Sequence, residues 1–322
     1  MRSTSDYRSL FEDRLSAVEY KGGNLAGLYE PVAYGVESGG KRLRPVLVLM
    51  GCEAFGGDVE EALWAACGVE MFHNFTLLHD DVMDDSDVRR GRPTVHCKWD
   101  VNTAILSGDT MRTMATLLMM RVPDAALRGV LDTFNGMAIE VYEGQRLDMD
   151  FETRDDVTSD EYIEMITLKT GALLGGSVAI GGMIAGGKEK SVKQLMEYGR
   201  CLGVAFQIQD DYLDVFGDAN TFGKPIGGDI VNGKKTYLLL EALGREGADA
   251  AALREAMSLT DNALKIQTVR RLYERMGIDE TCRKAILHWT GRALRALKKA
   301  DLPADAYECF SKFADKLIGR KK

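Results

Sequence analysis

Two short clusters of aspartates carry the clearest chemical signal in this chain of 322 residues. Each cluster has carboxylates at positions i, i+1 and i+4, first in Asp80–Asp84 and again in Asp210–Asp214. In a helix, side chains four positions apart stack one turn from each other on the same face. Carboxylates crowded on one face repel each other unless a cation neutralises them. The spacing therefore indicates two places that bind a hard divalent cation, which prefers oxygen ligands.

Magnesium fits this pattern better than calcium does. A calcium loop needs alternating ligands, a glycine in mid-loop and a terminal Glu, and neither cluster has them. A solvated acidic face would explain one cluster, but not two matching clusters that each follow an apolar run. Mg²⁺ is typically held by one or two carboxylates together with waters and substrate phosphates. We therefore expect a metal-bridged diphosphate, with the metal ligands Asp80, Asp81, Asp84, Asp210 and Asp214.

Cationic side chains lie near both clusters in the sequence or next to glycine breaks. The string Gly39–Pro45 places Lys41, Arg42 and Arg44 after a glycine pair. Arginine suits phosphate oxygens because its planar fork donates two parallel hydrogen bonds. His73 lies on nearly the same helix face as Asp80 and could donate to a phosphate. The other cations that we expect at a diphosphate are Arg89, Arg90, Lys169, Lys224 and Lys234.

Long helices are the elements that must position these residues. The chain has only six prolines, and proline breaks helix interiors. Apolar residues recur at helical spacing, as from Leu195 to Phe206. Ser159 or Asp160 is expected to cap one of the helices at its N-terminus. No linker separates two cores, so we predict a single all-α domain over residues 1–322.

The stretch from Thr170 to Gly187 has no charged residue, but its many glycines make it weakly apolar for a membrane span. We expect a buried helix in which glycines at 171, 175, 182 and 186 let neighbouring helices approach closely. The net charge of −8 argues against a nucleic-acid partner. The N-terminus does not resemble a signal peptide, and the scattered cysteines fit a reducing compartment. These features predict a cytoplasmic protein without a transmembrane segment.

Taken together, these residues resemble the trans-prenyl diphosphate synthase family. The resemblance rests on Gly39–Pro45, on His79–Asp84 followed by Arg89–Gly91, on Phe206–Asp214 and on Lys234–Thr236. It implies a helical bundle around a deep central cavity, a homodimer, and three Mg²⁺ ions on an allylic diphosphate. The C-terminal Arg320–Lys322 would either cover the second substrate site or remain a solvated tail.

The resemblance also implies a role for each of the basic and polar residues. Isopentenyl diphosphate would be bound by Lys41, Arg44, His73 and Arg90. The allylic diphosphate (dimethylallyl, geranyl or farnesyl) would be contacted by Arg89, Lys169, Thr170, Gln207, Lys224 and Lys234. Metal and cations would stabilise the departing diphosphate. The allylic cation would then condense with isopentenyl diphosphate, and the released diphosphate would take the proton.

Product length is expected to depend on side chains that precede the first cluster. At the helical rise, Phe75 lies about 7.5 Å and Phe72 about 12 Å before Asp80. In the family, an aromatic residue at the Phe75 position shortens products, and a second one at the position of Thr76 shortens them further. This pattern favours geranylgeranyl diphosphate, with farnesyl diphosphate as the alternative. A second interpretation is that both phenylalanines only pack the core.

Other classes of protein share parts of this pattern. A terpene cyclase mixes Asn, Ser or Thr with Glu in its second metal motif, and it has no use for the isopentenyl diphosphate residues. A non-catalytic partner subunit of a synthase usually loses one cluster, whereas this chain keeps both. An iron–carboxylate bundle needs two Glu-x-x-His pairs, and only Glu70–His73 has that spacing.

We predict that Asp80→Ala abolishes turnover and leaves the fold intact, because the removed carboxylate holds metal and not the core. Steady-state assays at saturating Mg²⁺ and circular dichroism would measure the two effects. Near-normal activity of the variant would rule out the metal interpretation.

Overall fold

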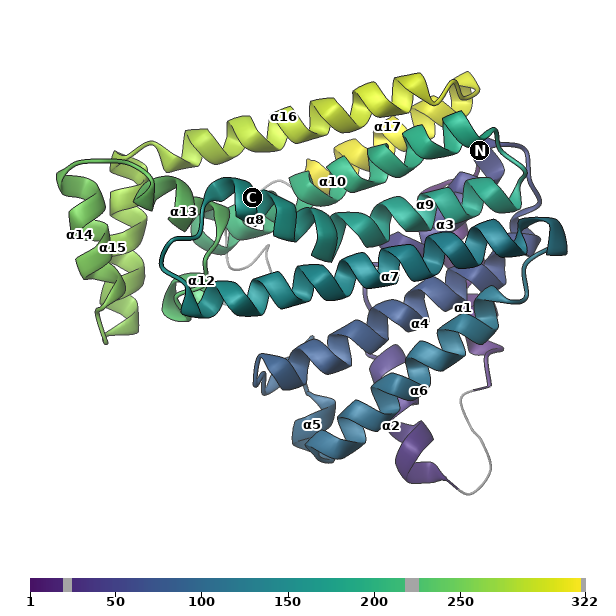
Figure 1. The fold of residues 1–322 in the computed structure, drawn as a ribbon, viewed down its shortest axis with the longest axis horizontal. Coiled ribbons are helices and arrows are strands. Elements are labelled where there is room, and N and C mark those ends of the chain that lie inside the picture. The colour runs from purple at the N-terminus through teal and green to yellow at the C-terminus, as the bar shows by residue number, and fades with distance from the viewer. Residues whose placement is uncertain (20–24, 218–225, 320–322) are drawn as a thin grey trace. The chain divides into compact units, whose positions relative to one another are not determined.

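The computed structural model describes residues 1–19, 25–217 and 226–319, and helices dominate it (Figure 1). The expectation of an all-α fold is confirmed, since the described part of the chain adds only one two-stranded sheet. The chain divides into two compact units. The first unit comprises Met1–Asn135, Gly176–Lys193 and Leu302–Cys309, and the second comprises Gly136–Gly175, Gln194–Asp301 and Phe310–Lys322. Each unit is therefore assembled from segments that are distant in sequence.

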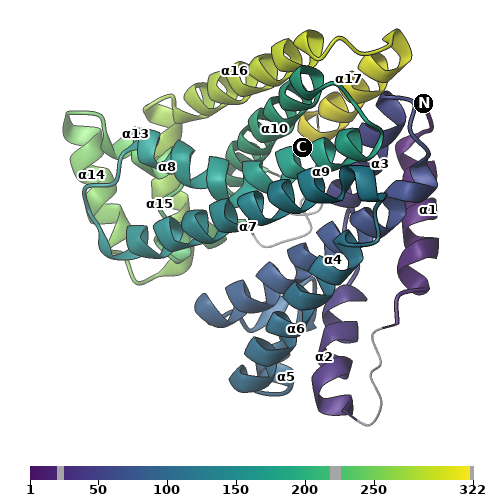
Figure 2. The same ribbon diagram turned by 45° about the vertical axis from the view of Figure 1, so that its right-hand side comes forward.

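The first unit is built around the long helix α4, with short strands after it. Figure 2 shows α2, α5 and α6 running beside α4, and α3 also packs on α4. Parts of α7 and α9, the start of α10 and the start of α17 complete this unit. Its other elements are α1 (Thr4–Ser16), α2 (Ala26–Val36), α3 (Leu43–Ala54), α4 (Val59–Met83), β1 (Val88–Arg89), β2 (Arg92–Pro93), α5 (Val95–Lys98) and α6 (Val101–Met119).

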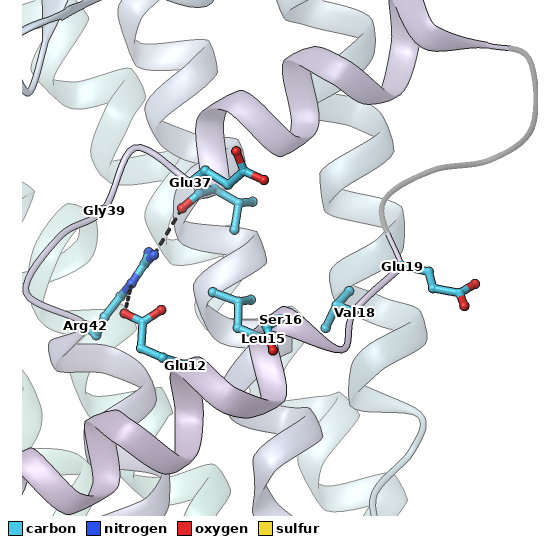
Figure 3. A pocket seen from close by; sticks show the side chains of 9 residues that line it. Glu12, Leu15, Ser16, Val18, Glu19, Glu37, Gly39 and Arg42 are labelled. Atoms are coloured by element: carbon cyan, nitrogen blue, oxygen red, sulfur yellow. Dashed lines mark hydrogen bonds and ion pairs between the residues drawn. The ribbon is translucent and has the colours of Figure 1, made fainter.

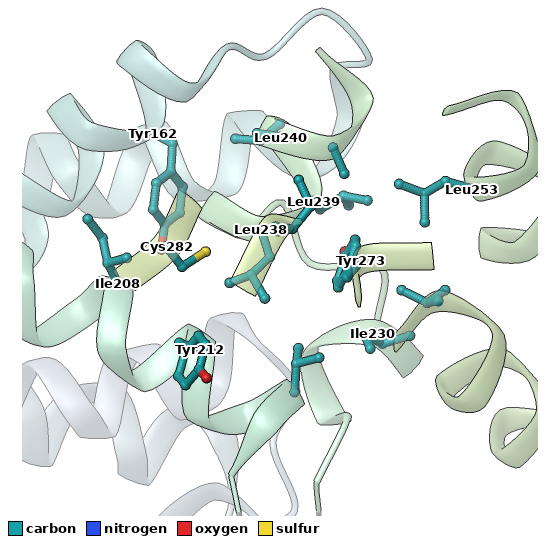
Figure 4. Packing of buried hydrophobic residues seen from close by; sticks show 14 of the residues in the cluster. Tyr162, Ile208, Tyr212, Ile230, Leu238, Leu239, Leu240, Leu253, Tyr273 and Cys282 are labelled. Carbon is teal, nitrogen blue, oxygen red and sulfur yellow. The ribbon is translucent and has the colours of Figure 1, made fainter. Parts of the chain in front are cut away.

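The second unit contains a cluster of short helices that pack against one another (Figure 4). Buried Leu238, Leu253 and Tyr273 lie in the middle of its core. Its elements, some of which are shared with the first unit, are α7 (Asp124–Thr153), α8 (Ser159–Ile166), the π-helical turn η1 (Thr167–Gly171), α9 (Ala172–Ile184), α10 (Glu189–Phe216), α12 (Gly228–Val231), α13 (Tyr237–Leu243), α14 (Ala248–Met257), α15 (Asn262–Arg275), α16 (Ile278–Lys299) and α17 (Ala304–Ile318).

Helix caps fix where the functional helices begin. Asp58 caps α4 by accepting a hydrogen bond from the backbone N–H of Glu60 at 3.0 Å. Helix α8 is capped by Thr158, which forms a capping box with Glu161. The predicted caps, Ser159 and Asp160, were therefore wrong, because both already lie inside the first turn of α8.

The glycine-rich segment is a buried helix, as the sequence predicted. In the second unit, Gly171 and Gly175 face Gly203 and Gly199 of α10, where a Cβ on either partner would lie within 3 Å of backbone. In the first unit, a Cβ on Gly181 would lie 1.9 Å from the carbonyl oxygen of Val48 in α3. Glycine is therefore required for these close helix contacts.

The prediction for Gly186 was wrong, because this glycine makes no close helix contact. It lies beyond the end of α9 with a φ of 70°, in the left-handed region that glycine adopts most easily. A Cβ there would meet nothing within 4 Å. Gly186 therefore belongs to the turn that ends α9 and does not pack against a neighbouring helix.

One continuous helical stretch of the described chain, Ser159–Ile184, is long and apolar enough to cross a membrane. Its most apolar window is 67% buried within the structure. A span would expose these side chains to lipid, so the burial marks a helix of the protein core.

We predict that Gly181→Ala lowers the free energy of unfolding by about 2 kcal/mol or more, because the new methyl group must displace the backbone of α3. Thermal and urea unfolding would measure the change. The matched control is Gly136→Ala in α7, where a Cβ meets nothing within 4 Å and which should gain about 0.5–1 kcal/mol. Equal stability of the two variants would contradict the close contact.

Candidate active site

The first aspartate cluster occupies the C-terminal end of α4. Asp80 and Asp81 lie in the last turn, and Asp84 is the C-cap, whose backbone N–H donates to the Asp80 carbonyl at 2.8 Å. No basic residue lies in this last turn. The C-terminal end of a helix carries a partial negative charge, which disfavours carboxylates and favours cations. The position of the cluster therefore strengthens the case for a bound cation.

Arg89 supplies one of the missing positive charges. Its Nε donates to Oδ1 of Asp81 at 2.6 Å. Asp81 is 3% exposed, and burial raises the pKa of its carboxyl group, while Arg89 acts in the opposite direction. The sequence placed both residues at the allylic diphosphate, and the structure brings them into direct contact. Arg89 therefore holds the Asp81 carboxylate in place within the cluster.

A β-hairpin that the sequence did not predict presents Arg89 and Arg90. Strands β1 and β2 pair with Arg89 opposite Arg92, so that Arg90 and Gly91 form the two-residue turn. Both turn residues have positive φ, 53° and 75°, as a type I′ hairpin turn requires. Tyr34 of α2 anchors the hairpin by donating to the carbonyl of Pro93 at 2.8 Å.

The residues predicted to bind isopentenyl diphosphate gather in the first unit. Arg90 donates from Nη1 to Ser38 Oγ at 3.0 Å and to the carbonyl of Gly39, which precedes the exposed Lys41. Arg44 donates from Nη1 to His73 Nε2 at 3.0 Å. Arg44 of α3, His73 of α4 and Arg90 of the hairpin are thus brought together, whereas the place of Lys41 in this group stays a prediction.

Arg44 lacks an anionic hydrogen-bond partner. Its Nε is buried and has no hydrogen-bond partner among the described residues. Burial lowers the pKa of Arg44 to about 10, and the charge of Glu70 opposes this shift. A buried guanidinium with an unused donor is costly, so the site is suited to an anionic ligand.

His73 is held as a neutral imidazole. Burial, followed by the charges of Arg44 and Arg90, holds the pKa of His73 well below its usual value. A guanidinium only donates, so Nε2 of His73 accepts and the ring proton belongs on Nδ1. Nε2 therefore cannot donate to a phosphate while this contact persists, and only Nδ1 could serve the predicted role.

The second cluster lies near the C-terminal end of α10, again with no basic residue in the last turn. Asp211 is 3% exposed and accepts from the hydroxyl of Tyr162, from Gln207 Nε2 at 3.2 Å and from the backbone N–H of Tyr237 at 3.3 Å. Burial raises the pKa of Asp211 to about 7, although the Tyr162 hydroxyl and Lys234 act against this. Asp211 therefore holds Tyr162, Gln207 and the backbone of Tyr237 in place beside the cluster.

Gln207 links Asp211 to the predicted diphosphate contact Thr170. The amide group of Gln207 donates to Asp211, so its Oε1 is left to accept from Thr170 Oγ1 at 3.2 Å. Thr170 and its neighbour Lys169 both lie in η1, where Lys169 Nζ forms an ion pair with Asp148 of α7. π-Helical turns are rare and frequently occur at functional sites. The structure thus brings Lys169, Thr170 and Gln207 into one connected region.

The two outer carboxylates of the second cluster differ in their contacts. Asp210 is half-buried, and no hydrogen bond or ion pair joins it to the described residues. Asp214 Oδ2 instead accepts from the backbone N–H of Asp229 at 3.1 Å, and its carbonyl accepts from Gly227 at 2.7 Å. Asp214 therefore fixes the start of α12, whereas Asp210 remains available to a metal ion.

The paired lysines after α12 have different roles. The charge of Lys234 acts to lower the pKa of Asp211, and its predicted contact with a diphosphate stays a prediction. Lys235 donates to the carbonyl of Arg154 and is therefore structural. Lys224 and the tail residues Arg320–Lys322 lie outside the described residues.

The carboxylates of the two clusters fit a magnesium ion whose remaining ligands come from a substrate and from water. Within the described residues, no three His, Cys, Asp or Glu side chains form a full metal site by themselves. A hard cation held by one or two carboxylates needs phosphate oxygens and water to complete its octahedron. Asp80 and Asp84 of the first cluster and Asp210 of the second are carboxylates that could each contribute to holding Mg²⁺, and the ion would supply positive charge that neutralises a leaving diphosphate.

The aromatic residues before the first cluster lie in the first unit. Phe72 is fully buried and packs on Phe134 with ring centroids 5.4 Å apart. Phe75 is 7% exposed and contacts both Phe72 and His79. The hydroxyl of Thr76 donates to the carbonyl of His73 at 2.8 Å. Phe72 is a core residue, and its role in product length stays a prediction, as does that of Phe75 and Thr76.

Comparisons with known proteins identify the family of the chain. The family model described as polyprenyl synthetase matches residues 26–276, a range that includes both clusters. A short chain isoprenyl diphosphate synthase of Methanothermobacter thermautotrophicus is 39% identical over 89% of this chain and 88% of its own. A geranylgeranyl diphosphate synthase of Saccharolobus solfataricus is 43% identical over 70% of this chain and 69% of its own.

Solved structures show the same fold along the whole chain. A crystal structure of a geranylgeranyl pyrophosphate synthase superposes with a TM-score of 0.95, at 43% identity and full coverage of both chains. A geranylgeranyl pyrophosphate synthase from Corynebacterium glutamicum, complexed with isoprenyl diphosphate and magnesium, superposes with a TM-score of 0.87 at 29% identity, over 99% of this chain and 98% of its own. This chain belongs to the polyprenyl synthetase family. It is a prenyltransferase of isoprenoid synthesis, in a family that uses Mg²⁺.

We predict that Tyr162→Phe lowers the free energy of unfolding by about 1–3 kcal/mol, because Asp211 would keep its burial and lose a donor. Chemical denaturation of the metal-free protein would measure this change. Tyr29→Phe is the control and should unfold like the parent, because Tyr29 is a half-buried residue whose side chain has no hydrogen bond in the described part of the chain. Identical unfolding of both variants would contradict the role given to Tyr162.

Proposed function

We propose that the protein is a geranylgeranyl diphosphate synthase, which extends allylic diphosphates by condensation with isopentenyl diphosphate. The observation that carries this proposal is the contrast between two kinds of anion site. Aspartate clusters at helix C-termini require metal, whereas the Arg44–His73–Arg90 group supplies positive charge by itself. A cyclase has no use for the second kind of site. The relatives from Saccharolobus solfataricus and Methanothermobacter thermautotrophicus support the same class of reaction.

The residues of this chain divide the chemistry between the two substrates. Arg89, Lys169, Thr170, Gln207 and Lys234 would orient the allylic diphosphate and stabilise charge on its departing oxygen. Lys224 is assigned to the same role from its motif. Isopentenyl diphosphate would lie against Lys41, Arg44, His73 and Arg90, which fix its double bond for attack. The released diphosphate would accept the proton, so the reaction would need no carboxylate of the clusters as a base.

The proposal also covers the number of metal ions, the oligomeric state of the protein and its place in the cell. We propose three Mg²⁺ ions with the diphosphate bound, held by Asp80, Asp81 and Asp84 of the first cluster and by Asp210 and Asp214 of the second. Mg²⁺ that reached Asp81 would share this carboxylate with Arg89. We place the protein in the cytoplasm and treat residues 1–322 as one domain, which agrees with a single family model that spans parts of both units.

A homodimer would cover the exposed apolar face of α6. Leu106 and Leu117 of this helix and its C-cap Met120 are 59%, 58% and 53% exposed, and Val101 and Ile105 lie on the same helix. Apolar side chains gathered on one helix mark a surface for association. We predict that Leu106→Glu/Leu117→Glu is monomeric in analytical ultracentrifugation, because two buried charges would oppose the interface. A variant that sediments like the parent would exclude α6 as the interface.

The proposed function is tested directly by product analysis. Purified protein would be incubated with isopentenyl diphosphate, Mg²⁺ and each of dimethylallyl, geranyl and farnesyl diphosphate, and the products identified by mass. We expect geranylgeranyl diphosphate as the main product from all three starters. Farnesyl diphosphate as the end product would establish the alternative synthase, and no product from any starter would contradict the enzyme and favour a non-catalytic partner subunit.

We predict that Phe75→Ala lengthens the product, because removing this ring opens space beyond the growing chain. Chromatography of the reaction products would measure the distribution. Phe134→Leu is a matched control, since it alters the same aromatic cluster, through the contact of Phe134 with Phe72, without replacing any residue of α4. An unchanged distribution in Phe75→Ala would refute the assignment.

A further inference from the structure

Arg42 is the one cation of the Gly39–Pro45 string that the proposed reaction does not use. It forms the N-cap of α3 with a φ of 51°, in the left-handed region that non-glycine residues rarely adopt. Its side chain is buried, with 3% of its surface exposed. A residue held in this way has a defined task within the fold.

The guanidinium of Arg42 connects three helices of the first unit, and Figure 3 shows its contact with Glu12. Nη1 donates to Glu70 Oε1 of α4 at 2.6 Å, and Nε donates to Glu12 Oε1 of α1 at 3.0 Å. Nη2 donates at 3.1 Å to the carbonyl of Val36, the last residue of α2. The donors of Arg42 are thus used within the protein and are not offered to a substrate.

Glu70 is the carboxylate that needs this partner. It is 2% exposed and also lies 3.3 Å from Nδ2 of Asn74. Its charge acts on Arg44 and Arg90 as well as on Arg42. Arg44, however, makes no ion pair in the described chain, and its Nε has no partner there. One buried anion thus lies among three arginines and pairs with only one of them.

We propose that Arg42 is a positioning residue that keeps Glu70 occupied and thereby leaves Arg44 available to the diphosphate of isopentenyl diphosphate. A buried carboxylate that loses its cation is strongly unfavourable. Without Arg42, Glu70 would draw the guanidinium of Arg44 to itself. The inference rests on the proposed function, because it assumes that Arg44 binds this substrate.

Steady-state kinetics of Arg42→Gln test the inference. The glutamine keeps a polar group beside Glu12 and Val36 and removes the charge that holds Glu70. The KM for isopentenyl diphosphate should rise about tenfold or more, the usual effect of losing one charge-assisted contact. The kcat and the KM for farnesyl diphosphate should stay within about twofold. An unchanged KM for isopentenyl diphosphate would overturn the inference.

A second substitution separates positioning from a merely structural role. In Arg42→Gln/Glu70→Gln, no carboxylate remains to compete for Arg44, so the KM should return close to that of the parent. A double variant that keeps the raised KM would overturn the inference. If the single variant does not fold, the double variant decides the question by the same two outcomes.

Arg14→Gln is the matched control. Arg14 also joins α1 to α4, through an ion pair with Glu60 at 2.9 Å, but its partner is 57% exposed. Its removal should leave both KM values unchanged, and a tenfold rise there would overturn the specific role of Arg42. Product formation by the parent protein in the same assay tests the proposed function separately. A parent protein that forms no product would contradict the proposed function, whereas the KM values of the variants test the role of Arg42.

Discussion

Carboxylates at the negative ends of two long helices are the constraint on which the rest of the structure depends. The clusters at the ends of α4 and α10 add anionic side chains where the helix already carries partial negative charge, and neither last turn contains a basic residue. Two of these carboxylates, Asp81 and Asp211, are almost fully buried. Buried carboxylates in such a position need hydrogen-bond donors or positive charge nearby.

Each unit supplies these donors in its own way. In the first unit a hairpin provides Arg89, which pairs with Asp81. In the second unit neutral donors serve instead, since Tyr162 and Gln207 bind Asp211. The difference concerns charge, because Arg89 balances the carboxylate of Asp81, whereas Asp211 is bound by neutral donors and burial raises its pKa to about 7. Elsewhere in the first unit, the buried ion pair of Arg42 with Glu70 keeps Glu70 from pairing with Arg44.

The sequence predicted the helices, the clusters and most of their partners, because spacing of charged and apolar residues is a local property. It did not predict the hairpin turn at Arg90, where an arginine adopts a conformation typical of glycine. The π-helical turn that holds Lys169 was also missed, since it depends on packing against Gly144 of α7. The Thr-x-x-Glu capping signal at Thr158 was present in the sequence, but the cap was assigned one or two residues too late, to Ser159 or Asp160. Arg42 was seen only as a cation, because its partner Glu70 is distant in sequence.

The central claim is that one diphosphate is bound through metal and the other through arginine. Isothermal titration calorimetry would test it with isopentenyl diphosphate and with an unreactive thio-analogue of farnesyl diphosphate, each in the presence of Mg²⁺ or of EDTA. The account predicts that EDTA weakens binding of the allylic analogue by at least about tenfold and leaves the affinity for isopentenyl diphosphate nearly unchanged. An equal loss of affinity for both ligands would contradict it.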